Sequence, residues 1–330
     1  MRGKAGRLAV LLNTLLYRHR EAGVVSSIIV LGAVFYSINP LFASLDTAAS
    51  IASIAAELGL MAVGVAFLMI AGEFDLSVGS VFAASGMLAI WLLNQGFPFW
   101  AAVAASLALG ALVGLTNAAI TIYGRIPSFI ATLGTMWIIR GVLLAVTGGF
   151  PVRLEADVDE LDIFAAKIVG DLRVSAFWFL GAAILLHFIL IATPFGNWMQ
   201  AVGGSPATAR ALGINVPLVK TIGFVVSGTL AALAGIIAMA RFKVVEPVAG
   251  LGMELEAIAS AVIGGCSLAG GIGTILGAAL AAFLVGEIRV GLILAGAPAY
   301  WYIGFVGLLL IVVGIINLRL GAGGNRVGRV

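Results

Sequence analysis

The chain has 330 residues, of which 62% are hydrophobic and only 10% are charged, and its formal net charge is +3. A soluble domain carries about 25% charged residues, so this chain cannot cover itself with a water-compatible surface. Its single cysteine, Cys266, excludes an intrachain disulfide and a cysteine-based metal cluster, and we expect no metal site. At about 20 apolar residues per crossing, the length allows around ten membrane spans.

Ten apolar stretches predict an all-α, polytopic membrane protein with some short or broken helices. In chain order they lie near residues 22–38, 48–70, 78–94, 99–122, 128–147, 176–193, 220–240, 254–264, 273–294 and 299–318. The stretch 254–264 is too short to cross as one straight helix, so it must tilt, break or be shielded by neighbouring helices. We interpret the first stretch, which follows a basic tail, as a retained signal anchor.

The lysine and arginine residues indicate that both chain ends lie in the cytoplasm. With the N-terminus inside, eleven of the eighteen basic residues fall on the cytoplasmic side and five on the outer side. The transmembrane domain then covers residues 22–318, between cytoplasmic tails at 1–21 and 319–330. The longest outer loop, 148–175, is acidic, and two interpretations stay open: a solvated surface, or a docking surface for an extracytoplasmic partner.

Two similar segments, which begin 192 residues apart (at 72 and 264), indicate a parallel internal repeat. Residues 72–79 (GEFDLSVG) and 264–271 (GGCSLAGG) share one leucine and two glycines at the same spacing. Both follow a span that runs from outside to inside. Glycines there suit the broken helices of transporters, although small-residue helix packing is an alternative for each single glycine.

The first motif, residues 71–80 (AGEFDLSVGS), places two carboxylates beside an apolar span. They are costly there unless they are paired or wet. Asp75 is positioned to N-cap a helix that begins near Val78, and serines nearby can share that role. A capped helix start and a site that faces the pathway or a partner are compatible interpretations. The motif residues at this span break are Gly72, Glu73, Asp75, Ser77 and Gly79.

The second motif, residues 201–214 (AVGGSPATARALGI), predicts a short helix in the longest cytoplasmic loop, 194–219. Ser205 is a suitable N-cap, Pro206 suits the first helical position and Gly213 suits the stop. Two turns are too short to be stable alone in water, so this helix needs something to pack against. Small side chains would let it seat closely in a groove. The residues assigned to it are Ser205, Pro206, Ala207, Ala209, Arg210, Leu212 and Gly213, with Ala211 as a further small residue.

Polar residues inside spans are candidates for lining a pathway. Glu57, Asn117 and Glu287 are the three that we assign to this role. Because a charge in the membrane is costly, Glu287 is expected to face the bundle interior or a wet cavity. Arg140 lies near the end of a span, where its side chain is expected to reach the headgroups.

Together these segments resemble the permease subunits of the ribose- and xylose-type class of bacterial ABC sugar importers. The matching stretches are AGEFDLSVGS, PSFIATLGTMWIIRG, AVGGSPATARALGIN and GMELEAIASAVIGGCSLAGGIGT. Many members have Gly-Ile or Gly-Val where Glu73 and Phe74 stand here, which bears on the substrate but not on the family. The resemblance implies a multi-pass protein of the bacterial inner membrane, not itself an enzyme, that forms the pathway for a monosaccharide or related small polar solute.

The resemblance also implies partners: a cytoplasmic ATPase that binds ATP and magnesium, a second permease copy or paralogue, and a periplasmic binding protein. It identifies the segment 203–214 with a coupling helix that seats in the ATPase. We expect lipid around the chain, but no cofactor on it and no nucleic acid. The chain lacks a G-x-x-x-x-G-K-[ST] phosphate loop of its own. The alternative is an ion-driven secondary transporter of small polar solutes, which an inverted repeat with intramembrane acids would favour.

Overall fold

A computed structural model describes residues 20–298, 301, 302, 304, 305, 307, 308 and 311. Within this part, seven helices are long and apolar enough to cross a membrane. They are α2 (Arg20–Ile38), α3 (Leu45–Ile70), α5 (Phe99–Ile122), α6 (Ser128–Thr147), α8 (Ser175–Ala192), α11 (Val216–Phe242) and α13 (Ile275–Leu294).

Shorter elements connect these helices. The helical ones are η1 (Pro40–Ala43), α4 (Val78–Asn94), η2 (Asp159–Leu161), α7 (Asp162–Ala165), α9 (Pro194–Gly204), α10 (Pro206–Ala211) and α12 (Met253–Ile263). The strands are β1 (Val152–Arg153), β2 (Lys167–Val169), β3 (Leu172–Arg173) and β4 (Val244–Val245). β1 pairs with β4 and β2 with β3, both antiparallel.

The helical class is confirmed, and nine predicted spans correspond to α2, α3, α4, α5, α6, α8, α11, α12 and α13. Their bounds differ from the predicted ones by four residues at most. Thirteen of the twenty residues of the tenth predicted span, 299–318, lie outside the described residues, as do the two predicted tails apart from residues 20 and 21.

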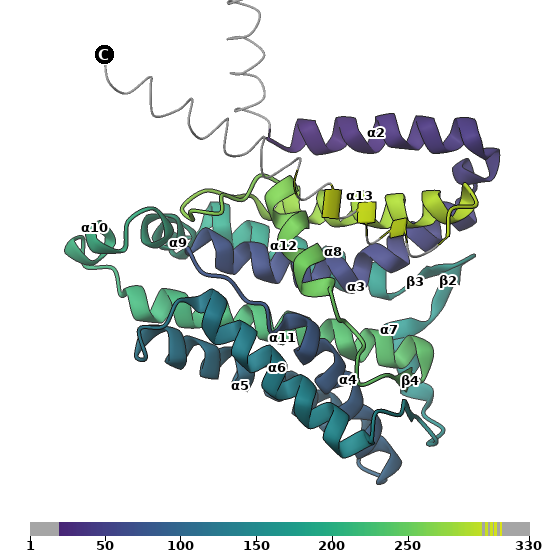
Figure 1. Cartoon of the computed structure of the whole chain (residues 1–330), viewed down its shortest axis with the longest axis horizontal. Helices are drawn as coiled ribbons and strands as arrows, with labels where there is room; N and C mark the ends of the chain where they lie inside the picture. The colour runs from purple at the N-terminus through teal and green to yellow at the C-terminus, as the bar shows by residue number, and fades with distance from the viewer. Residues whose placement is uncertain (1–19, 299–300, 303, 306, 309–310, 312–330) are drawn as a thin grey trace, which may run out of the picture.

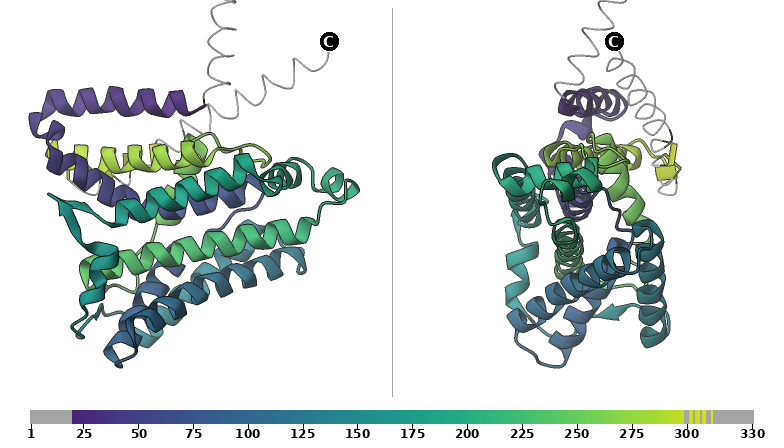
Figure 2. Two further views of the ribbon diagram at one scale, coloured as in Figure 1. Left: turned by 180° about the vertical axis from the view of Figure 1, so that it is seen from behind. Right: turned by 90° about the vertical axis from the view of Figure 1, so that its left-hand side faces the viewer.

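α3 lies at the centre of the bundle and α2 at its edge (Figures 1 and 2). In its most apolar stretch 89% of α3 is buried, against 11% for α2. Glycines allow the inner helices to approach closely, which is how helices associate in a membrane. For example, a side chain at Gly110 of α5 would collide with the backbone of Gly228 of α11.

The two halves of the predicted repeat run in the same direction. The backbone N–H of Gly271, just after α12, donates to the carbonyl of Ile70 at the end of α3 over 3.0 Å. α3 and α12 therefore end at the same side of the molecule, where α9 and α10 also lie (Figure 1). This agrees with a parallel repeat. The match is partial, because α4 begins six residues after Gly72 whereas α13 begins eleven after Gly264.

The acidic loop, 148–175, is a folded cover at the opposite end of the bundle (Figure 1). It contains β1, β2, β3 and two short helices. Phe164 packs between Phe99 and Trp178, with ring centroids 6.0 and 5.3 Å away. The acidic side chains are exposed at the loop surface, apart from Asp171, which is part-buried and pairs with Lys167. The choice between a solvated face and a docking surface stays open.

Candidate functional site

The chain between α3 and α4 forms the first span break, and its backbone is held by side chains of α6. Gly72 ends α3 in the left-handed region (φ +84), which glycine adopts without strain. The backbone N–H groups of Phe74 and Leu76 then donate to the hydroxyl oxygens of Ser128 and Thr132, over 3.1 Å each. These two hydroxyls lie one helical turn apart on the same face of α6. They can therefore accept from two N–H groups that lie two residues apart in the segment after α3.

Asp75 is fully buried at the centre of this break. Its carboxylate accepts from the backbone N–H of Ser77 (2.9 Å), from the Ser77 hydroxyl (2.6 Å) and from the Ser227 hydroxyl of α11 (2.9 Å). Asn117 of α5 donates to the Ser77 hydroxyl over 2.9 Å. We call these four residues the Asp75 network. It joins α3–α4, α5 and α11 through polar contacts inside an apolar bundle.

The predicted role of Asp75 as the N-cap of α4 is wrong in detail. The helix begins at Val78 as predicted, but the N-cap residue is Ser77, whose side chain makes no capping bond. Asp75 lies two residues earlier and accepts from Ser77 itself. The carboxylate thus stabilises the turn that precedes α4. It does not accept from the free N–H groups of the first helical turn.

The other acidic residue of the motif, Glu73, forms an ion pair with Lys220 near the start of α11. Both side chains are largely buried, with 10% and 17% of their surface exposed. Gly79 lies against the 250–254 segment, where an added Cβ would sit 2.5 Å from the Gly250 carbonyl oxygen. Four of the five motif residues are buried and Gly72 is part-buried, and together they contact α5, α9, α11 and the 250–254 segment.

Three glycine-containing segments meet backbone to backbone beside this break. A Cβ at Gly72 would lie 3.3 Å from the Cα of Gly203, in the last turn of α9. A Cβ at Gly271 would lie 2.8 Å from Gly204. We call the contact of Gly72, Gly203 and Gly271 the glycine junction. It connects both halves of the repeat with the helix that precedes α10.

α10 matches the predicted short helix. The Ser205 hydroxyl accepts from the N–H of Thr208 over 3.3 Å, Pro206 opens the helix and Gly213 follows it with φ +82. Leu212 is 73% exposed and Ala207 and Ala211 are exposed too. Ala209, by contrast, is only 1% exposed, because it packs against its own chain. Its expected role as a contact residue for a partner is therefore corrected.

The three candidates for pathway lining do not come together. Asn117 belongs to the Asp75 network. Glu57 of α3 forms an ion pair with Arg241 of α11 at 3.1 Å. Glu287 of α13 is buried against α2, where a Cβ at Gly32 would lie 3.0 Å from its Oε1, and its Oε2 has no partner among the described residues.

Arg140 does not reach the headgroups, contrary to expectation. It is 3% exposed and donates to the carbonyl oxygens of Pro247 (2.5 Å) and Ala249 (2.8 Å) in the chain between α11 and α12. Its guanidinium satisfies backbone groups of that irregular segment. Sequence reasoning missed this role, since the partners lie more than 100 residues away along the chain.

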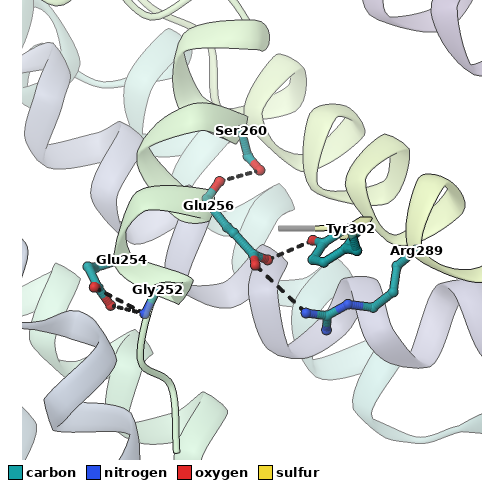
Figure 3. A network of polar contacts seen from close by, with 6 residues as sticks. All are labelled: Gly252, Glu254, Glu256, Ser260, Arg289 and Tyr302. Carbon is teal, nitrogen blue, oxygen red and sulfur yellow. Dashed lines mark hydrogen bonds and ion pairs between the residues drawn. The ribbon is translucent and has the colours of Figure 1, made fainter. Parts of the chain in front are cut away.

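A second polar network surrounds the start of α12 (Figure 3). Glu256 accepts from the Tyr302 hydroxyl at 2.8 Å and pairs with Arg289 of α13 at 3.7 Å. The Arg289 guanidinium also lies over the Tyr302 ring, 4.4 Å from its centroid. Arg289 thus pairs with an acid on α12 and not with Glu287, which stands two residues away on its own helix.

A cavity of about 280 Å³ lies between α3, α4, α11 and the segment that follows α11. Its polar lining comes from two acids, Glu57 and Glu246. The rest of the lining is apolar: Phe82, Gly235, Ala238, Phe242, Val244, Val245 and Ala249. Glu246 is exposed and has no ion-pair partner within the described part of the chain.

Comparisons with known proteins agree with these features. The family described as "Branched-chain amino acid transport system / permease component" matches residues 47–314. The ribose import permease protein RbsC of Escherichia coli (strain K12) is 37% identical over 83% of this chain and 86% of its own length. RbsC of Haemophilus influenzae is 34% identical over 89% and 92%. The autoinducer 2 import system permease protein LsrC of Photorhabdus laumondii is 35% identical over 93% and 91%. No solved structure matches the chain.

Proposed function

This chain belongs to the ribose-type family of ABC importer permeases, multi-pass proteins of the inner membrane, and we propose that it imports a monosaccharide or a related small polar solute. The family description names branched-chain amino acids, whereas the relatives that match most of the chain are named for ribose and autoinducer 2. The printed names of these individual relatives, each aligned over more than four fifths of the chain, support the proposed solute class. A permease component is not itself an enzyme, so the driving energy has to come from elsewhere.

The source of energy that we propose is a separate cytoplasmic ATPase that binds ATP and magnesium and docks on α10. One observation carries this proposal: α10 is an exposed helix whose two neighbours both contact the first span break. α9 reaches the break through Gly203, and α11 reaches it through the pair of Lys220 with Glu73. A displacement of α10 would therefore act on the Asp75 network from two sides.

Two further partners complete the proposed importer. A second permease copy or a paralogue would pair with this chain in the membrane. A periplasmic binding protein would deliver the solute at the end covered by the acidic loop. The exposed side chains of Glu155 and Asp159 provide charge for that contact.

The proposal is tested by uptake of radiolabelled D-ribose, D-xylose and D-glucose into proteoliposomes that contain the permease with its genomically adjacent ATPase and binding protein. We expect at least one sugar to be taken up. Its uptake should require ATP on the side of the vesicle membrane where the ATPase lies, and it should persist when ionophores collapse all ion gradients. Uptake that continues without ATP and stops with ionophores would establish the ion-driven alternative instead.

The docking role of α10 has its own test. Leu212→Asp places a charge on the exposed end of the helix, whereas Ile126→Asp places the same charge on an exposed apolar residue of the neighbouring α5–α6 connection. We expect Leu212→Asp to lose co-purification with the ATPase and solute-stimulated hydrolysis, while Ile126→Asp keeps both. Normal stimulation by the Leu212→Asp variant would refute the assignment of α10.

A further inference from the structure

The chain between α11 and α12 enters the membrane without regular structure. α11 has 27 residues and, at about 1.5 Å per residue, is long enough to cross the bilayer alone. α12 has only 11 residues, about 16 Å, and so covers roughly half of a 30 Å hydrocarbon core. Residues 243–252 must therefore descend from the outer surface to mid-membrane depth. Irregular backbone is tolerated there only inside protein or against a water-filled cavity.

One side of this segment is fully accounted for by protein contacts. Val244 and Val245 form β4, which pairs with β1. The carbonyl groups of Pro247 and Ala249 accept from Arg140. The acidic loop, through β1, and α6, through Arg140, thus fix this side of the segment in place.

The other side of the segment lines the cavity of about 280 Å³ described above. Its size is close to the lower end of small-molecule pockets, which measure about 300–1,000 Å³ and combine apolar walls with a few polar groups. Here the walls include the rings of Phe82 and Phe242, and the polar groups are the carboxylates of Glu57 and Glu246. Glu57 is held in place by Arg241, while Glu246 is free to accept hydrogen bonds from a ligand.

We propose that this cavity is a water-filled outer vestibule that binds a neutral polyhydroxyl solute before it reaches the first span break. The proposal rests on the import function proposed above. Carboxylates accept hydrogen bonds from hydroxyl groups, and phenyl rings pack on the C–H faces of a sugar ring. The cavity has two carboxylates, Glu57 and Glu246, and the nearby Arg241 is already paired with Glu57. The negative charge disfavours binding of an anionic solute, such as an amino acid through its carboxylate.

The vestibule lies next to the Asp75 network along two helices. Phe82 of α4 stands five residues after Ser77, and Gly235 of α11 stands eight residues after Ser227. Eight helical residues span about 12 Å, so the vestibule sits roughly two turns from the buried network. A solute in the vestibule would contact the helix whose start is fixed by Asp75.

Thiol accessibility tests the vestibule directly. Ala238 is 6% exposed and lines the cavity, so Ala238→Cys can be reached from water only through it. Ile184→Cys is the control, because Ile184 is 60% exposed on the apolar surface of α8, where lipid keeps a thiol unreactive. Wild-type protein is the blank, since its single cysteine, Cys266, is buried. The probe is a cationic, membrane-impermeant methanethiosulfonate applied to the complete importer in proteoliposomes.

We expect Ala238→Cys to react at least about tenfold faster than Ile184→Cys, because only a hydrated thiol ionises readily. D-ribose, D-xylose or D-glucose, whichever the uptake assay identifies, should slow this reaction, whereas it should leave the control unchanged. Reaction no faster than that of the control, or no protection by the transported sugar, would overturn the proposal. The importer could also show rapid labelling that the sugars slow, but no ATP-driven uptake. That result would support the vestibule and refute the proposed import function.

A kinetic experiment tests the contribution of the free carboxylate. Glu246→Gln should raise the KM for uptake about threefold or more and leave the maximal rate of ATP hydrolysis unchanged, because it removes a ground-state contact with the solute. Asp46→Asn, at an exposed acid in the first turn of α3 and outside the acidic loop, is the control and should change neither quantity. An unchanged KM for Glu246→Gln would remove Glu246 from the proposed site.

Discussion

The two span breaks of the repeat differ in how their backbone is stabilised. After α3, the chain is held by side chains: the carboxylate of Asp75 and the hydroxyls of Ser128 and Thr132. After α12, the corresponding segment is held mainly by backbone contacts, in which Gly271 donates to Ile70 and lies against Gly204. The first break requires particular polar groups, whereas the second requires that side chains be absent.

This difference predicts opposite sensitivities. Removing a polar group should damage the first break, since buried donors would lose their acceptor. Adding a single methyl group should damage the glycine contacts, since backbone atoms cannot move aside as a flexible side chain can. The expected effects decrease from Asp75→Ala through Gly203→Ala and Lys220→Glu to Asp171→Asn.

The largest effect is expected for Asp75→Ala. The substitution leaves the N–H of Ser77 and the hydroxyls of Ser77 and Ser227 without their acceptor. At about 1–3 kcal/mol for each unsatisfied buried group, a loss on the order of 3 kcal/mol or more is expected. Thermal unfolding in detergent and sugar uptake measure it. Asp75→Asn keeps an acceptor oxygen and should unfold at a higher temperature than Asp75→Ala. If both variants equal the wild type, the network does not stabilise the break.

The next effect concerns the glycine junction. Gly203→Ala brings a methyl group against the Ile70 carbonyl and the Gly271 N–H, and overpacking of this kind costs about 1–3 kcal/mol. Gly204→Ala is an adjacent control with no atom within 4 Å of the new methyl group. In a helix it should be neutral or slightly stabilising. We expect a lower unfolding temperature and weaker coupling of ATP hydrolysis to uptake for Gly203→Ala alone. Equal behaviour of both variants would contradict the junction.

A smaller effect is expected for the pair of Glu73 and Lys220. Because both side chains retain some contact with solvent, breaking the pair should cost about 1 kcal/mol, well below the value for a fully buried pair. Lys220→Glu alone should reduce the uptake driven by each ATP hydrolysed. Combining it with Glu73→Lys should restore that ratio. A double variant that behaves no better than the single one would show that the pair does not transmit movement.

The smallest effect is expected at the opposite end, in the β2–β3 hairpin. There a hydrogen bond from Lys167 and its charge lower the pKa of Asp171, whose side chain is 49% exposed, below its ordinary value. Because the folded-state pKa is depressed, the pair stabilises above the unfolded-state pKa, and its contribution disappears as pH falls through the folded-state value. Asp171→Asn should therefore leave unfolding at neutral pH almost unchanged, which a thermal shift measurement checks. A shift as large as that of Gly203→Ala would contradict this ranking.

Local signals made part of this structure predictable from the sequence. The span bounds follow from long apolar runs that end at charges, proline or glycine. The ends of α10 follow from Ser205, Pro206 and Gly213, because each acts within one turn of the backbone. The side of α10 that faces the protein was not predictable, since a six-residue helix is too short to show a clear apolar face.

Long-range partners were not predictable. Glu73 and Lys220 lie 147 residues apart and Glu57 and Arg241 lie 184 apart, and only the packing of α3 against α11 brings them together. The break contains one signal that was overlooked. Ser128 and Thr132 stand four residues apart on one face of α6, which is the spacing that two hydroxyls need to serve neighbouring backbone groups.

The burial of Ala209 has a consequence for the way in which α10 meets a partner. Because this residue seats the helix on its own chain and both helix ends are capped, α10 is already folded and oriented before anything binds. Association then requires little further ordering of the backbone, which for a flexible loop would subtract from the affinity. In the proposed complex with an ATPase, a preorganised helix of this kind would pass a displacement on to α9 and α11 in either direction of the transport cycle.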